Sequence, residues 1–258
     1  YISIGYRVDN AIFYTSFSTA KNRHDVTQVT EPQFPLGTPE QVNQYEHPFI
    51  FDLDGTIISS NKSIINSFNQ TFLKYNLKKT NHTEFLKFAN YGSKFYIKSK
   101  FPKLRASQVD EINDYFKNYY KKNCTKQIQI KKGLVFFLNK FKKHTTYLVV
   151  TNKTKLSSIK ILKFLKINKY FKNIYSGENI NYRKPNGKKI NEIIIKLKKN
   201  NKLLMIGDSE ADEKLAQNQS INFALIKEGY TNKKYTYFKK KYLFKDYYHL
   251  SSLLTDDN

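Results

Sequence analysis

Asp52 and Asp54 have a spacing that could support chemistry. They stand at positions i and i+2 of the pentapeptide Asp-Leu-Asp-Gly-Thr, directly after the apolar run 48–51. Side chains at i and i+2 of an extended chain point to the same side, so both carboxylates could project over one edge of a sheet. Two such groups can serve as a nucleophile and as a general acid–base. Taken alone, however, an Asp-Gly pair is also a common turn.

A second acidic cluster contains Asp208 and Asp212, in the hexapeptide Gly-Asp-Ser-Glu-Ala-Asp that follows the apolar run 203–206. Acidic residues are scarce in this part of the chain, since residues 47–258 hold only 16 of them. Carboxylates gathered in one place repel one another unless a cation neutralises them. Because Mg²⁺ prefers carboxylate oxygens as ligands, the two clusters together predict a magnesium site.

Side chains that could bind an anion stand at two further places. Thr151 and Asn152 follow the apolar run 147–150, and Lys184 lies in the polar loop Asn-Tyr-Arg-Lys-Pro-Asn-Gly-Lys-Lys. A hydroxyl, an amide and the backbone N–H groups that enter a helix suit a phosphate. Each also has a plainer explanation, because a threonine here could cap a helix and lysines are abundant throughout the chain. Only the combination with the acidic clusters indicates a site.

The elements that must position these residues are short apolar strands, which alternate with helical patterns from residue 47 onward. Uniformly apolar runs are typical of strands buried on both faces, in a parallel sheet covered by helices. Apolar residues recur at near-helical spacing over 156–165 and 190–197. The pattern predicts a doubly wound α/β fold whose site lies at the carboxyl ends of the strands. The predicted strands are 48–51, 147–150, 174–175, 203–206 and 223–226.

The long stretch 58–145 interrupts this alternation. It is too long for a simple crossover connection, so we expect an inserted, mostly helical cap there. The α/β core then comprises residues 47–57 and 146–258. Residues 1–46 differ in composition and are expected to be an N-terminal extension of unknown role, in which 11–17 could form an extra strand. The helical patterns expected within the cap are 64–75, 83–88 and 109–120.

The ordered set of motifs resembles the haloacid dehalogenase-like hydrolases, the aspartate-nucleophile phosphatases, over roughly residues 47–258. The first motif of that family, DxDGT, stands here as Asp52–Thr56, and the second as Thr151. The lysine motif stands as Lys184 and the fourth motif, GDxxxD, as Gly207–Asp212. Further detail, including Gly229-Tyr230, is similar to the phosphoglycolate phosphatase-like branch. The resemblance implies a Rossmann-like parallel sheet with helices on both faces, usually ordered 3-2-1-4-5, and an inserted α-helical cap.

The resemblance also implies catalytic and metal-binding roles. Asp52 would attack phosphorus and form an aspartyl-phosphate, which divides hydrolysis into two easier displacements. Asp54 would protonate the leaving oxygen and then deprotonate the attacking water. Mg²⁺ would be held by Asp52, by the backbone carbonyl of Asp54 and by Asp208, and would shield the nucleophile from the charge of the phosphate.

The remaining implied roles concern the phosphate group. Thr151, Asn152 and Lys184 would bind its equatorial oxygens, where the charge of the transition state collects. Asp212 would orient Lys184 or a metal-bound water without contacting the substrate. One departure from the family pattern is Ser59, which stands where many relatives have an aspartate after the first motif.

The net charge is +24, from 45 basic and 21 acidic residues, which would normally suggest nucleic acid or an anionic membrane as a partner. Only four of the basic residues are arginine, the residue favoured for bidentate phosphate binding, so nucleic acid is a possible partner but not the favoured one. No apolar run is long enough to span a membrane, and no membrane partner is expected. The single Cys124 cannot form an internal disulfide, which favours a reducing, cytoplasmic location. Nothing in the sequence indicates an oligomeric state.

The function expected from these features is that of a Mg²⁺-dependent phosphatase. It would hydrolyse a small phosphorylated metabolite, such as a phosphoglycolate-like phosphomonoester, through an aspartyl-phosphate. Two enzymatic alternatives stay open: a phosphatase acting on nucleotides or nucleic-acid ends, and a phosphoglucomutase-like phosphotransferase. A basic binding protein that keeps the fold without turnover is the non-enzymatic alternative. A dehalogenase is disfavoured because that branch lacks the second aspartate of the first motif.

Overall fold

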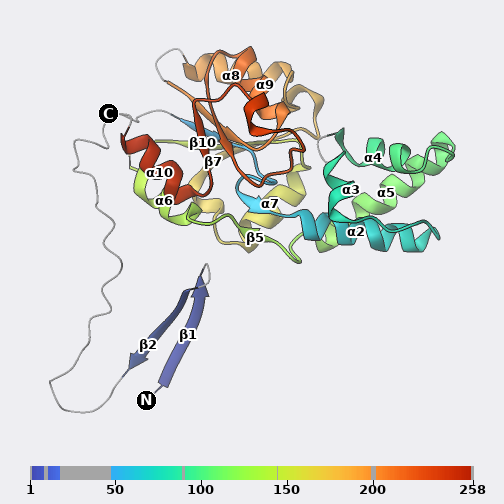
Figure 1. Cartoon of the computed structure of the whole chain (residues 1–258), viewed down its shortest axis with the longest axis horizontal. Coiled ribbons are helices and arrows are strands. Elements are labelled where there is room, and N and C mark those ends of the chain that lie inside the picture. The colour runs from blue at the N-terminus through green and yellow to red at the C-terminus, as the bar shows by residue number, and fades with distance from the viewer. Residues whose placement is uncertain are drawn as a thin grey trace.

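A parallel sheet forms the centre of the molecule (Figure 1). The computed structural model describes residues 2–8, 11–17, 48–88, 91–143, 145–198 and 202–256. The sheet has six strands in the order β10-β9-β8-β3-β6-β7, and every neighbouring pair is parallel. Taken in chain order, its first five strands have the order 3-2-1-4-5, which confirms the arrangement implied by the family resemblance. The strands are β3 (Phe49–Phe51), β6 (Tyr147–Thr151), β7 (Phe171–Ser176), β8 (Leu204–Gly207), β9 (Asn222–Ile226) and β10 (Tyr242–Phe244).

The strands are apolar because both faces of the sheet are covered. Successive side chains of a strand point to opposite faces, and here they alternate between two hydrophobic clusters. Phe49 and Phe51 belong to one cluster, whereas Ile50 between them belongs to the other. Helices on both faces supply the remainder of each cluster, so the predicted Rossmann-like α/β class is confirmed. One face is covered by α6 (Leu134–Phe141), α7 (Lys155–Phe164) and α10 (Tyr247–Asp256), the other by α8 (Lys188–Lys198) and α9 (Glu210–Asn218).

Between two short strands, β4 (Ile58–Ser59) and β5 (Gln129–Ile130), which pair antiparallel, the described residues include four α-helices. Their packing is aromatic: the rings of Phe68 and Phe116 stack with centroids 3.9 Å apart. We call these helices the inserted module; they lie together at one end of the molecule (Figure 1). Their bounds are α2 (Asn61–Lys74), α3 (His82–Leu86), α4 (Ser93–Lys100) and α5 (Ala106–Asn123).

The predicted domain boundaries at residues 57 and 146 stay a prediction. The helix α6 falls within the stretch 58–145, yet its residues pack against α10 and the sheet.

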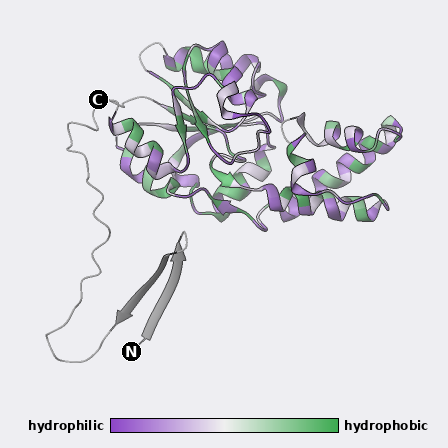
Figure 2. Cartoon of the chain, in the orientation of Figure 1, coloured by the Kyte–Doolittle hydropathy of each residue, from purple (hydrophilic) through white to green (hydrophobic). Residues whose placement is uncertain are grey.

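The distribution of hydropathy matches this architecture, because the strands at the centre are apolar and the helices around them carry both polar and apolar residues (Figure 2). No helix among the described residues has the length and apolar character that crossing a membrane requires.

Shorter elements complete the fold. Single-turn helices of the described part of the chain, among them η2 (Asn168–Tyr170), η3 (Ile180–Tyr182) and η4 (Tyr235–Tyr237), lie in loops. In the N-terminal segment, β1 (Ile2–Val8) pairs antiparallel with β2 (Ala11–Phe17), so the stretch 11–17 is a strand, as the sequence suggested. The other residues of the predicted extension 1–46 lie outside the described residues.

Candidate active site

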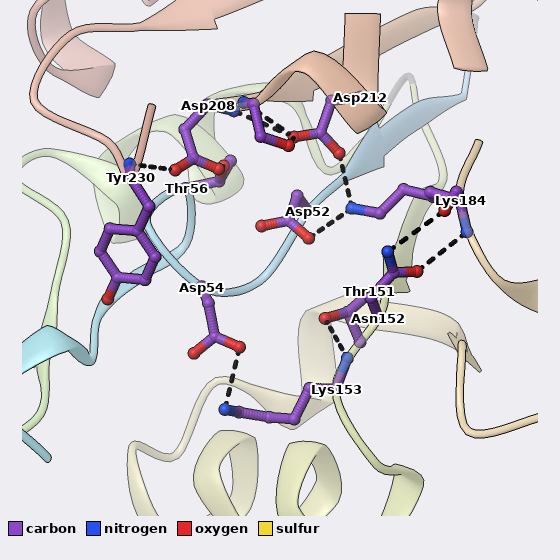
Figure 3. A network of polar contacts seen from close by, with 11 residues as sticks. Asp52, Asp54, Thr56, Thr151, Asn152, Lys153, Lys184, Asp208, Asp212 and Tyr230 are labelled. Atoms are coloured by element: carbon purple, nitrogen blue, oxygen red, sulfur yellow. Dashed lines mark hydrogen bonds and ion pairs between the residues drawn. The ribbon is translucent and has the colours of Figure 1, made fainter. Parts of the chain in front are cut away.

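The predicted site residues come from loops that leave adjacent strands at one edge of the sheet. Strand β3 lies between β6 and β8, with Phe51 opposite both Val149 and Ile206. Since the three strands are parallel, their carboxyl ends meet at the same edge. Asp52 follows β3, Thr151 ends β6 and Asp208 follows β8, so folding brings these side chains together (Figure 3).

Lys184 joins the two acidic clusters. Its Nζ lies 2.5 Å from Asp52 Oδ1 and 2.5 Å from Asp212 Oδ1, and its side chain is only 3% exposed. Burial favours the neutral amine, but the charges of Asp212 and Asp52 outweigh it and raise the pKa of Lys184 above its ordinary value. A lysine selected from the sequence by its family motif is therefore a buried ammonium group between two carboxylates.

The carboxylates hold more negative charge than Lys184 can balance. Burial raises the pKa of Asp52 to about 7, against the opposing charge of Lys184 and with a further contribution from Asp212. Burial and the charges of Asp52 and Asp212 raise the pKa of Asp208 well above its ordinary value. A divalent cation would remove this cost, because it would pair with carboxylates that are now forced together.

The donor set fits such a cation. Asp52, Asp208 and Asp212 each offer a carboxylate oxygen, and these oxygens lie within 4.8 Å of one another. Of the three predicted metal ligands, Asp52 and Asp208 belong to this group. The side chain of Asp54 instead faces Lys153, so only the backbone carbonyl of Asp54 is left for the predicted role.

Asp212 is the centre of a hydrogen-bond network rather than a free carboxylate. Its Oδ2 accepts bonds from the backbone N–H groups of Asp208 and Ser209 at 3.2 and 3.1 Å, and from Ser209 Oγ at 2.7 Å. Its Oδ1 accepts from Lys184 Nζ. Because Asp212 lies in the first turn of α9, where a carboxylate satisfies free N–H groups, it is fixed in place. Such a fixed group can orient Lys184, as the predicted role of Asp212 requires.

Asp208 is held by contacts that the sequence analysis did not assign. Thr56 Oγ1 donates to Asp208 Oδ1 at 3.2 Å, and the backbone N–H of Tyr230 donates to Oδ2 at 2.5 Å. Thr56 belongs to the first motif and Tyr230 to the Gly-Tyr pair after β9, so both stood within motifs already quoted. Their contact with Asp208 depends on the tertiary fold, which spacing along the chain does not reveal.

Both carboxylate oxygens of Asp54 are engaged. Oδ2 lies 2.9 Å from Lys153 Nζ, and Oδ1 accepts a short hydrogen bond from Ser60 Oγ. Lys153 also donates to the hydroxyl of Tyr120, on α5 of the inserted module, at 2.7 Å. The sequence analysis missed Lys153, Ser60 and Tyr120. The only available signal was that Lys153 directly follows the predicted phosphate-binding pair.

The two residues of that pair have different surroundings. Thr151 is buried, and its Oγ1 accepts from the backbone N–H of Lys153 at 3.2 Å. The side chain of Asn152 is tied to the backbone of Lys184: Oδ1 accepts from Lys184 N at 2.9 Å and Nδ2 donates to Lys184 O at 3.2 Å. Asn152 therefore joins the loop carrying Lys184 to the end of β6.

Together the fold and the site define a class of protein: a Rossmann-like α/β fold with a buried lysine and three carboxylates at the carboxyl edge of its parallel sheet. The chain belongs to the haloacid dehalogenase-like hydrolase family, whose model matches residues 49–226. Within that family the chain is similar to proteins named phosphoglycolate phosphatase and to proteins named pyrophosphatase PpaX.

Individual comparisons agree with this assignment. The chain is 26% identical over 189 residues to a phosphoglycolate phosphatase of Agrobacterium fabrum, covering 71% of this chain and 81% of that relative. It is 24% identical to the pyrophosphatase PpaX of Bacillus cereus, covering 69% of this chain and 81% of that relative. A crystal structure of a predicted phosphoglycolate phosphatase from Haemophilus somnus superposes with a TM-score of 0.74 at 20% identity, over 81% of this chain and 99% of the other. That likeness supports the fold.

Proposed function

We propose that the protein is a Mg²⁺-dependent phosphatase that hydrolyses a small phosphomonoester of the phosphoglycolate type through an aspartyl-phosphate. The observation that carries the proposal is the contact of Lys184 with both Asp52 and Asp212, beside Asp208. A lysine and several carboxylates buried at one point are costly for folding alone, and such clusters are found at functional sites. The phosphatase names of the relatives support the same activity.

In the first step an Oδ atom of Asp52 attacks phosphorus, and the bond from phosphorus to the leaving oxygen breaks. Asp54 gives its proton to that oxygen. In the second step Asp54 takes a proton from a water whose oxygen attacks phosphorus, which releases phosphate and restores Asp52. Mg²⁺ held by Asp52, Asp208 and the backbone carbonyl of Asp54 would supply positive charge against the approach of two negative groups.

The transferred phosphoryl group needs donors for its other oxygens. In this proposal Lys184 supplies an ammonium group, Thr151 a hydroxyl, and the backbone N–H groups after β6, including that of Asn152, further donors. Such donors stabilise the charge that spreads over the equatorial oxygens in the transition state. Asp212 holds Lys184 in position for this contact.

Replacement of the nucleophile tests the proposal. Asp52→Asn is expected to lower the turnover of an aryl phosphate by at least about 1,000-fold, on the scale seen when a covalent nucleophile is removed. EDTA is expected to abolish wild-type turnover, and Mg²⁺ to restore it. Asp114→Asn serves as the matched control, because the Asp114 side chain is 70% exposed and pairs only loosely with Lys117. Substantial turnover by Asp52→Asn, or turnover that persists in EDTA, would contradict the mechanism.

A substrate screen separates the remaining alternatives. Purified protein with and without Mg²⁺ would be offered phosphorylated metabolites, sugar phosphates, nucleotides and 5′-phosphorylated oligonucleotides. We expect the highest kcat/KM with a small phosphorylated acid. A clear preference for oligonucleotide ends would favour the alternative that rests on the net charge of +24. Conversion of one sugar phosphate into another would favour the phosphotransferase.

A further inference from the structure

The segment that carries Lys184 has no regular element of its own. Residues 183–187 connect η3 to α8 and belong to neither a helix nor a strand. The ammonium group of Lys184 pairs with Asp52 and Asp212, but a lysine stem is long and flexible. The place of the charge therefore also depends on where the backbone of Lys184 is held.

The side chain of Asn152 holds that backbone at both of its polar groups. The N–H of Lys184 donates to Asn152 Oδ1 at 2.9 Å, and Asn152 Nδ2 donates to the carbonyl of Lys184 at 3.2 Å. Figure 3 shows both bonds side by side, from one amide to one residue. Because an amide can accept and donate at once, the two bonds fix the orientation of Lys184 as well as its distance.

The Asn152 amide also has a close neighbour in Gly177. A Cβ atom added at Gly177 would lie 2.7 Å from Asn152 Oδ1 and 2.9 Å from Asn152 Cα. The backbone N–H of Gly177 in turn donates to the carbonyl of Thr151 at 2.6 Å. The end of β6, Gly177 and the backbone of Lys184 thus form one hydrogen-bonded and closely packed unit around the Asn152 side chain.

This unit joins two segments that supply donors in the proposed mechanism. One is the end of β6, with the hydroxyl of Thr151 and the backbone N–H groups that follow it. The other is Lys184, which stands 32 positions after Asn152 in the chain. Donors from two segments can stabilise the same phosphoryl group only if their separation is fixed in advance.

We propose that Asn152 is a positioning residue whose side chain sets the distance between Lys184 and the donors at the end of β6. The inference rests on the proposed function and assigns separate roles to the two parts of one residue. The backbone N–H of Asn152 serves as a donor to the phosphoryl group. The side chain acts through Lys184 and makes its contribution when charge collects on the phosphoryl oxygens in the transition state.

Asn152→Ala tests the inference, because alanine keeps the backbone N–H and removes both bonds to Lys184. With an aryl phosphate and Mg²⁺, kcat is expected to fall by about 10- to 100-fold, up to the loss caused by a displacement of about 1 Å. KM is expected to change by less than about threefold, because Thr151 and the backbone donors still bind the substrate. A loss in kcat without a comparable change in KM is a readout that general loosening of the fold would not produce.

Asn179→Ala is the matched control. Asn179 is exposed, as Asn152 is, and its side chain also accepts from a backbone N–H, that of Asn181, at 3.0 Å. It stands in the same connection between β7 and α8, so its loss disturbs the same region without removing a bond to Lys184. We expect this variant to keep both kcat and KM.

A double-mutant cycle measures whether Asn152 acts through Lys184. Lys184→Arg keeps a positive charge but places it differently. If Asn152 positions Lys184, the loss of kcat/KM in the double variant should be smaller than the product of the two single losses, by about fivefold or more. Losses that multiply in full would show that the Asn152 side chain acts independently of Lys184, and they would overturn the inference.

Two further outcomes of Asn152→Ala would also overturn it. One is an unchanged kcat, and the other is a raised KM with kcat unchanged, since that pattern belongs to a side chain that binds the substrate directly. All of these outcomes require an active wild type. A wild type without Mg²⁺-dependent turnover of any phosphate ester would instead overturn the proposed function, and the inference with it.

Discussion

At Gly55 the chain has no room for a methyl group. Its φ is +85°, and a Cβ atom added there would lie 2.2 Å from Asp208 Oδ2. Asp208 is itself fixed by Thr56 and by the backbone of Tyr230. A glycine in the first motif is therefore needed for two reasons: a backbone conformation that other residues rarely adopt, and the close approach of the carboxylate from β8.

Gly55→Ala is expected to lower hydrolysis by about 100-fold, the scale of a catalytic group displaced by about 1 Å. Gly92→Ala is the matched control for stability, because Gly92 also has a positive φ, of +88°, but nothing lies within 4 Å of an added Cβ. That variant carries only the backbone strain, about 1–3 kcal/mol of unfolding free energy. Urea denaturation measures the strain in both variants, and initial rates measure the displacement of Asp208. Equal stability losses with full activity in Gly55→Ala would show that Asp208 tolerates the methyl group.

The sequence could predict a site residue only where its type and position stand out from the rest of the chain. Asp52, Asp54 and Asp208 were recognisable because carboxylates are rare in a basic chain and here stand at strand ends. Lys153 could not be chosen in the same way, since lysine is abundant and its partner Tyr120 is more than 30 positions away. Such contacts depend on how the inserted module packs against the core, and a local sequence pattern does not predict that packing.

The same limit holds for whole elements. Strands buried on both faces leave an unmistakable apolar run, and β3, β6, β8 and β9 were predicted close to their observed bounds. β10 and α4 were not predicted. The burial of β10 alternates, with its middle residue half-buried, and α4 has only two buried residues, Tyr96 and Ile97. Short elements at the edge of a sheet or among aromatic side chains are stabilised mainly by packing against neighbouring elements. The periodicity of apolar residues in their own sequence is therefore weak.

One ion pair within the inserted module gives a pH-dependent test of its packing. Lys100 on α4 is 5% exposed and lies 2.5 Å from Glu84 on α3. Burial tends to raise the pKa of Glu84, but the hydrogen bond and charge of Lys100 outweigh it and hold the pKa below its ordinary value of 4.5. A lowered carboxyl pKa stabilises the folded state above the ordinary value. That contribution is lost as pH falls through the lowered pKa.

Glu84→Gln is therefore expected to lower the free energy of unfolding by about 1 kcal/mol at about pH 7, because Glu84 is partly exposed and solvent screens the pair. The difference from wild type should disappear at a pH below the lowered pKa. Asp110→Asn is the control, since Asp110 and Lys94 form an ion pair that also joins two helices but is more than half exposed. Urea titrations at both pH values provide the measurement. If the loss of unfolding free energy in Glu84→Gln were the same at both pH values, the pair would stabilise the module through packing and not through its charges.

At the scale of the whole molecule, a strongly basic chain is built around a small acidic centre. The net charge of +24 raises the rate at which anionic substrates meet the protein, whatever its origin. The buried carboxylates of Asp52, Asp208 and Asp212 lie inside that positive field, next to Lys184. The folded state thus concentrates negative charge at one point, and only folding brings β3, β8 and α9 close enough to create it.

Because the acidic centre exists only in the folded state, Mg²⁺ should bind the folded protein far better than the unfolded chain. At a concentration about 100 times its Kd, such a ligand adds about 2.7 kcal/mol of stability, or an increase in Tm of about 5–10 °C for a domain of this size. Thermal unfolding with and without Mg²⁺ measures the increase, and it requires no turnover. Asp208→Asn removes one carboxylate and should lose most of the increase, whereas Asp114→Asn, which alters an exposed carboxylate, should keep it. An equal increase in Asp208→Asn and wild type would mean that Mg²⁺ stabilises the protein from some other place.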